Sequence, residues 1–156
     1  MAKKRRDKNQ GRISSNVDKG FARGEIKSLS DRLLEQAGIH FSLRFLDCTN
    51  SDFSFDKREP DYYSKLIRRL KDVSQLKAQE LFSNRSSGLR AHPIDFINDN
   101  VSEKTFGVKG WKEIDDLAYQ FEVAQSLGRV HGFLVDTTFY VRWIDPDHNL
   151  YKGKHK

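Results

Sequence analysis

Three short apolar-rich runs dominate the last third of the chain, and clusters of Ser, Gly, Asp and Thr separate them. The runs are Tyr119–Ala124, Arg129–Val135 and Phe139–Ile144. Their Val, Phe, Tyr and Trp residues favour strands, and the polar clusters are typical of turns between paired strands. The pattern predicts a three-stranded antiparallel meander. We expect Phe139, Val141 and Trp143 to alternate with their neighbours onto one buried face.

Apolar residues upstream of the meander follow two different periods. From Ile39 to Phe45 every second residue is apolar, as in a half-buried strand. After Pro60, which suits the first turn of a helix, apolar residues recur at helical spacing. They are Tyr62, Leu66, Ile67, Leu70 and Val73. A second helix is expected over Leu76–Phe82, and residues 89–97 look extended, although Pro93 excludes a central strand.

The order of these elements predicts an α+β fold. A capping pattern that starts at Ser28 predicts one more short helix, ending near Ala37. We expect an antiparallel sheet, made of one N-terminal strand plus the C-terminal meander, with helices packed on one face. The predicted organisation is a flexible arm over residues 1–27, a single domain over 28–152 and a polar tail over 153–156.

Charge is distributed unevenly along the chain. The whole chain has a net charge of +6, and residues 1–27 carry nine basic and three acidic residues, whereas the rest is balanced. Such arms bind phosphate backbones without sequence preference, and a solvated tail that aids solubility is an equal alternative. The nucleic-acid-binding candidates are Lys3, Lys4, Arg5, Arg6, Lys8 and Arg12.

Composition also limits the compartment and the cofactors. The single cysteine, Cys48, excludes an internal disulfide framework and a thiolate zinc site, and it favours a reduced, cytoplasmic setting. No apolar run reaches the roughly 18 residues of a membrane span, and the basic start lacks the apolar stretch of a secretory signal. The histidine and aspartate spacing matches no metal motif, and no small-molecule cofactor is expected.

The meander resembles the sheet of the RelE/ParE-like toxin superfamily, which includes the HigB-type toxins. The resemblance is carried by Gly128, Arg129 and Val130, by the Phe139–Ile144 run, and by the HNLY ending at residues 148–151. It implies a fold with one strand and a helical hairpin before the meander. The same stretch also resembles a group of small uncharacterised bacterial proteins that end in an RVHGF…FYxxWxDPxHxLY pattern, and that resemblance implies no chemistry.

The toxin resemblance implies a metal-independent endoribonuclease of a toxin–antitoxin or phage-defence system, acting on messenger RNA and held in check by a cognate antitoxin. Cleavage would run by attack of a 2′-hydroxyl on the adjacent phosphate, which needs a base, an acid and a cation. The matched positions are Arg129, His148 and Tyr151. His131 shares the face of Arg129, and Arg142 lies on the neighbouring strand. The catalytic candidates are therefore Arg129, His131, Arg142, His148 and Tyr151.

Departures from the family pattern leave a second function open. The first meander strand carries Glu122 where several members have lysines, and Asp145 and Asp147 flank His148. Negative charge at these places weakens contact with an RNA phosphate. The alternative is a non-catalytic nucleic-acid- or ribosome-binding module, in which the basic arm contacts nucleic acid and the α+β body docks a protein partner.

Each candidate also has a purely structural interpretation. A strand histidine such as His131 is more often a half-buried residue with one hydrogen bond than a catalyst. His148 is equally explained as part of a proline-containing turn, and Tyr151 also has an interpretation as a cap on the core. Residues 90–93, which include His92, either join the site or form an ordinary loop.

Overall fold

The computed structural model describes four stretches of the chain, which are residues 28–33, 36, 38–83 and 88–153. The predicted basic arm over residues 1–27 lies outside them, as do the last three residues of the predicted tail. The chain divides into two units, Met1–Gln36 and Ala37–Lys156. In the first unit residues 28–33 are helical, as predicted. The helix was expected to end at Gln36 or Ala37; residue 36 is a turn residue, and residue 37 falls outside the described residues.

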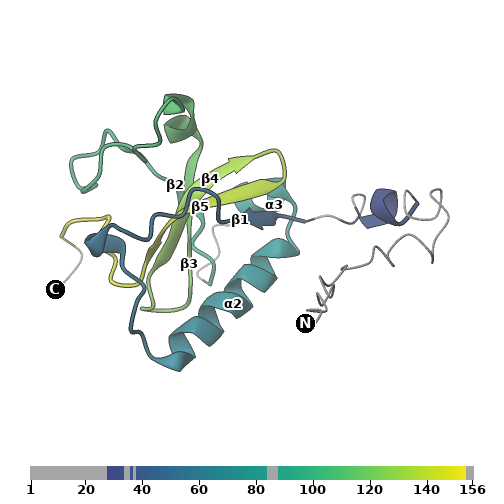
Figure 1. The fold of residues 1–156 in the computed structure, drawn as a ribbon, viewed down its shortest axis with the longest axis horizontal. Helices are drawn as coiled ribbons and strands as arrows, with labels where there is room; N and C mark the ends of the chain where they lie inside the picture. Colours follow the sequence, from purple (N-terminus) through teal and green to yellow (C-terminus); the bar gives the residue numbers. More distant parts are fainter. Residues whose placement is uncertain (1–27, 34–35, 37, 84–87, 154–156) are drawn as a thin grey trace, which may run out of the picture. The chain divides into compact units, whose positions relative to one another are not determined.

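The second unit is built on a five-stranded mixed sheet with the strand order β1-β5-β4-β3-β2 (Figure 1). The strands are β1 (His40–Ser42), β2 (His92–Pro93), β3 (Ala118–Glu122), β4 (Arg129–Val135) and β5 (Thr138–Asp145). Strand β4 pairs antiparallel with both β3 and β5, and β2 adds antiparallel to the outer edge of β3. The α+β class is thus confirmed. Strand β2 is a two-residue edge strand, in keeping with a proline that has no N–H to donate to a second neighbour.

The prediction of a wholly antiparallel sheet is wrong, because β1 runs parallel to β5. Apolar alternation fixes which face of a strand is buried, but not its neighbour or its direction. Two backbone hydrogen bonds hold the start of β1. The amide of Ile39 donates to Leu76 O, just after α2, at 2.9 Å, and the amide of His40 donates to Thr137 O at 2.8 Å. The second bond places the start of β1 beside the start of β5.

A β-bulge in β5 overturns the expectation that Phe139, Val141 and Trp143 share a face. The register is Gly132 to Val141 but His131 to Trp143, so β5 holds one extra residue, Arg142. All three apolar side chains are buried, as predicted. However, Phe139 and Val141 pack in the cluster under the α-helices, whereas Trp143 packs in the cluster on the opposite face.

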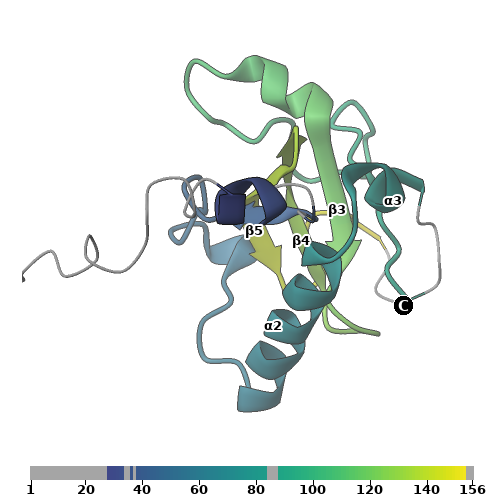
Figure 2. The ribbon, with the colours of Figure 1, turned by 90° about the vertical axis from the view of Figure 1, so that its right-hand side faces the viewer.

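Two α-helices cover one face of the sheet (Figure 2). Helix α2 spans Pro60–Ser74 and buries Tyr62, Leu66 and Val73, whereas Ile67, expected on the same face, is 63% exposed. Helix α3 spans Ala78–Ser83 and buries Leu81. The predicted placement of helices on one face is therefore confirmed for α2 and α3.

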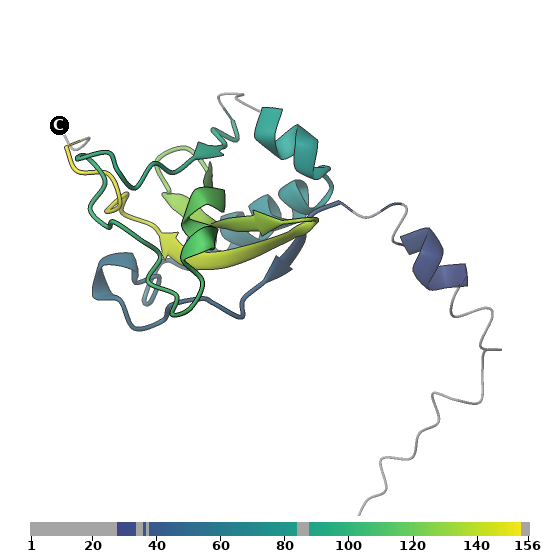
Figure 3. The same cartoon turned by 90° about the horizontal axis from the view of Figure 1, so that it is seen from above.

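Loops and two 3₁₀ helices cover the opposite face (Figure 3). The 3₁₀ helices are η2 (Ser51–Phe53) and η3 (Lys112–Leu117). They contribute the buried side chains of Phe53 and Ile114, and the loop between β2 and η3 adds Phe106. This second face is thus also an interior, and polar side chains that point to it are sealed between the sheet and the loops.

Candidate functional site

A row of polar side chains crosses the loop-covered face at one end of the sheet. On β3 and β4, every second residue faces this side, and the ladder sets Gln120 opposite His131 and Glu122 opposite Arg129. Because of the bulge, β5 contributes Asp145, which is the ladder partner of Arg129. The predicted sharing of one face by Arg129 and His131 is confirmed.

His131 and Asp145 form a sealed pair beneath the surface. Their side chains are 0% and 1% exposed, and His131 Nε2 lies 3.1 Å from Asp145 Oδ2. Burial lowers the pKa of His131, and the hydrogen bond to Asp145 only partly opposes this shift. Burial acts to raise the pKa of Asp145, but the hydrogen bonds that its carboxylate accepts outweigh it, and the net shift is downward. The pair is therefore a neutral imidazole that donates its Nε2 hydrogen to a carboxylate.

This burial gives His131 a structural role instead of contact with a ligand. Its pKa lies below the ordinary value of 6.5, so the unfolded chain binds a proton more readily, and stability is lost as the pH falls below that value. Between about pH 7.5 and pH 5.5, we expect the free energy of unfolding to fall by about 1 kcal/mol more in the wild type than in His131→Gln. Denaturant titrations of both proteins at the two pH values measure the difference. An equal fall in the free energy of unfolding in the two proteins would contradict a neutral, buried His131.

The carboxylate of Asp145 also fixes the turn that carries His148. Asp145 Oδ1 accepts the amide hydrogen of Asn149 at 2.8 Å, and Oδ2 accepts that of Leu150 at 3.0 Å. Residues 146 and 147 form a turn, as predicted, and His148 adopts a left-handed backbone conformation with φ at 59°. His148 is thus a turn residue whose position depends on the buried pair.

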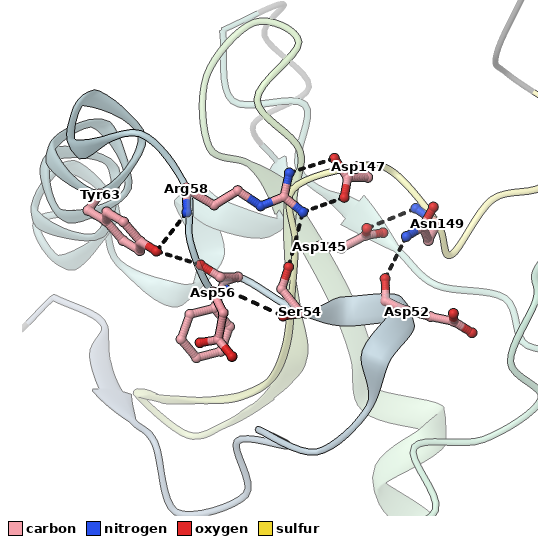
Figure 4. Close-up of polar contacts among 9 residues, drawn as sticks. Asp52, Ser54, Asp56, Arg58, Tyr63, Asp145, Asp147 and Asn149 are labelled. Atoms are coloured by element: carbon pink, nitrogen blue, oxygen red, sulfur yellow. Dashed lines mark hydrogen bonds and ion pairs between the residues drawn. The ribbon is translucent and has the colours of Figure 1, made fainter.

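The loop before α2 clamps the same turn from outside (Figure 4). Both guanidinium ends of Arg58 bond to the two carboxylate oxygens of Asp147, and Asn149 Nδ2 donates to Asp52 O at 2.6 Å. Tyr63 in turn accepts the amide hydrogen of Arg58 at 3.1 Å. The charge of Asp147 is therefore neutralised by an arginine from a distant part of the chain.

A small cavity of about 60 Å³ opens beside the buried pair. Its lining residues are His92, Gln120, Arg129, His148 and Tyr151. Three of the predicted catalytic residues, Arg129, His148 and Tyr151, thus meet in one place. From the sequence alone, His92 is either a site residue or part of an ordinary loop. Gln120 is not singled out, because a polar residue on an alternating strand is expected to face solvent.

Gln120 links two sides of the cavity from below. It is fully buried, and its Nε2 lies 2.8 Å from Tyr151 Oη, to which it donates, and 3.2 Å from His92 Nε2. Burial raises the pKa of Tyr151, so the phenol keeps its proton at neutral pH. Since Tyr151 Oη accepts from Gln120, its own hydrogen remains available as a donor. The cavity therefore offers a phenol O–H held in a fixed position.

Arg129 supplies the positive charge of the cavity. Burial lowers its pKa, although an arginine remains charged at any physiological pH. The neighbouring Glu122 carboxylate, which is 4% exposed, is also 3.6 Å from Arg90 Nε. Arg90 and Arg129 thus both lie near Glu122, and Asp145 is a second carboxylate that acts on Arg129.

Arg142, the remaining predicted catalytic residue, lies away from this cavity. Its guanidinium donates to Phe45 O and Phe106 O, each at 2.9 Å, and approaches Asp47 at 3.4 Å. These contacts tie two loops to the bulge of β5. Arg142 therefore has a structural role in the observed arrangement.

Comparison of the chain with protein-family models, curated proteins and solved structures found no match. The function is therefore inferred from the cavity itself. Within the described stretches, no group of three or more His, Cys, Asp or Glu side chains is placed to hold a metal ion. None of the helices in those stretches is long and apolar enough to cross a membrane.

Proposed function

We propose that this chain is a metal-independent endoribonuclease of the toxin–antitoxin or phage-defence type, built on a RelE-like fold. The observation that supports it is the meeting of Arg129, His148 and Tyr151 in the lining of one cavity. The element order of β1, then α2 and α3, then β3 to β5 also matches the strand, helical hairpin and meander of that superfamily.

The three side chains have the chemistry that RNA self-cleavage by the 2′-hydroxyl requires. Arg129 is a permanent cation for the charge that develops on the phosphorane. His148 supplies an imidazole, a side chain that can act as a general base or acid. Tyr151 donates a hydrogen bond to a phosphate oxygen or to the leaving oxygen. No step of this reaction needs a metal ion.

The acidic residues beside His148 are less of an obstacle than their sequence position indicates. Asp145 is sealed beneath the surface and accepts hydrogen bonds from His131 and from two backbone amides. Asp147 is engaged by Arg58 (Figure 4). We expect RNA, free or on the ribosome, to be the substrate, and an antitoxin protein to be the partner that neutralises it.

Expression from a tightly repressed promoter tests this function. We expect the wild type to arrest growth and to cleave messenger RNA. Cells that express His148→Ala or Tyr151→Phe should grow normally and keep their messenger RNA intact. His40→Ala, a change at an exposed histidine on the sheet edge, is the matched control and should behave like the wild type. Normal growth with intact RNA in all four strains would refute a free-standing toxin.

An apolar groove at the other end of the sheet favours a second candidate, the non-catalytic binding module. Its volume is about 160 Å³, and its main lining residues are Phe45, Trp111, Ile114, Phe133, Val135 and Tyr140. Trp111 is 58% exposed, which is unusual for so large an apolar side chain. In this case the groove docks a protein partner, and the basic arm contacts nucleic acid or the ribosome. Deletion of residues 1–27 or Trp111→Glu would then abolish function, while His148→Ala would not.

A further inference from the structure

We propose that His92 is a second catalytic imidazole of this cavity, acting with His148 as the general acid–base pair of RNA cleavage. This inference rests on the proposed ribonuclease function and extends it to a residue far from the other candidates in sequence. Strand β2 pairs with the outer edge of β3 and sets His92 opposite Gln120. Residue 92 thereby enters the wall of a cavity whose other members come from residues 120 to 151.

The position of the His92 ring is held by its neighbours. Its Nδ1 lies 3.0 Å from Pro93 O, and Gln120 Nε2 lies 3.1 Å from Nδ1 and 3.2 Å from Nε2. The buried amide of β3 therefore holds the imidazole at the wall of the cavity. A general acid or base needs such a held position, because proton transfer requires hydrogen-bond reach to the substrate.

The amide of Gln120 provides independent support for a built site. It is fully buried in the sheet, and its Oε1 has no hydrogen-bond partner among the described residues. Leaving a buried polar atom unsatisfied costs about 1–3 kcal/mol. An apolar residue at this position would avoid that cost but would release His92 and Tyr151, which the amide holds on either side. The glutamine is thus better explained by the positions of these two side chains than by packing.

Two histidines, His92 and His131, lie in the same row of the sheet on either side of Gln120, and they differ in exposure. His131 also lies opposite Gln120, on the β4 side, but it is fully buried and bonded to Asp145. His92 is exposed and lines the cavity. Only an exposed imidazole can meet a bound phosphodiester.

Two imidazoles account for both proton transfers of the reaction. One accepts the proton of the ribose 2′-hydroxyl as the 2′-oxygen bonds to phosphorus. The other, in its protonated form, donates a proton to the 5′-oxygen as the bond between phosphorus and that oxygen breaks. The products are a 2′,3′-cyclic phosphate and a 5′-hydroxyl, and the proton count is restored by exchange between the two rings and water.

The test is the pH dependence of cleavage of a short RNA by the purified full chain in the presence of EDTA. We expect the wild type to form cyclic phosphate with a bell-shaped profile, because one ring must be neutral and the other protonated. His92→Ala should lose about 100-fold in rate together with one limb of the profile, and added imidazole should restore part of the rate. His40→Ala, at an exposed histidine on the opposite edge strand, should match the wild type.

The outcomes distinguish this inference from the proposed function. A wild type that cleaves, with a His92→Ala variant that keeps the rate and both limbs, would overturn the role of His92 and leave the ribonuclease standing. A wild type that gives no cyclic phosphate would overturn both. A third outcome is a His92→Ala variant that is slow, shows no rescue by imidazole and keeps both limbs of the pH–rate profile. That result would assign His92 a structural role and would also overturn the inference.

Discussion

Arg129→Gln is expected to lower the rate of RNA cleavage by about 100- to 1,000-fold, the usual effect of removing one group that stabilises transition-state charge. Arg129 is the cation that lines the cavity, and it lies half-buried beside Glu122. A neutral amide of similar reach cannot balance the charge of the phosphorane. Single-turnover kinetics with saturating enzyme measure the loss in the chemical step, free of any change in binding.

Two further variants make this prediction specific. Arg129→Lys keeps the charge but not the forked donors, so an intermediate rate is expected. Arg68→Gln removes an equal charge from an exposed position on α2 and should leave the rate unchanged. If Arg68→Gln were as slow as Arg129→Gln, general electrostatic attraction of RNA would explain the loss and the cavity would not.

Asp145→Ala is expected to lower the free energy of unfolding by about 3–5 kcal/mol, because each buried donor left without an acceptor costs about 1–3 kcal/mol and several donors are affected. The carboxylate accepts hydrogen bonds from His131 Nε2 and from the amides of Asn149 and Leu150. The donors of His131 and Leu150 would be left buried without an acceptor, and the part-buried amide of Asn149 would lose its acceptor as well. Denaturant unfolding at neutral pH measures the loss.

Asp147→Ala is the matched control, since it removes a carboxylate from the same turn. Its side chain is 51% exposed, and its ion pair with Arg58 lies at the surface. Exposed pairs contribute about 1 kcal/mol or less. Equal losses in the two variants would mean that the turn, and not the buried carboxylate, is the source of stability.

Local patterns predicted the elements that have strong local signals. The apolar spacing after Pro60 predicted α2, and the apolar-rich runs in the last third predicted β3, β4 and β5 to within a few residues. The toxin resemblance groups Arg129, His148 and Tyr151, which all lie in or directly after this segment. Arg142 was placed with them only because it lies on a neighbouring strand.

The other half of the cavity depends on contacts that no local pattern encodes. Strand β2 has two residues, too few to show a period, so the approach of His92 to β3 was left open. The alternation on β3 predicts that Gln120 and Glu122 face water. They are buried because the loops that carry Phe53 and Phe106 fold over that face, a property of the tertiary structure alone.

The extra residue in β5 decides which of its side chains reach the buried pair. On a strand without the bulge, strict alternation from Val141 would turn Trp143 and Asp145 toward the helices and Ile144 toward His131. Deleting Arg142 would restore regular alternation but would leave Trp143, Ile144 and Asp145 on their present faces, because Arg142 is itself the extra residue. A frame-preserving deletion of that codon would thus keep the register of the site and remove only the guanidinium that ties Phe45 and Phe106 to β5.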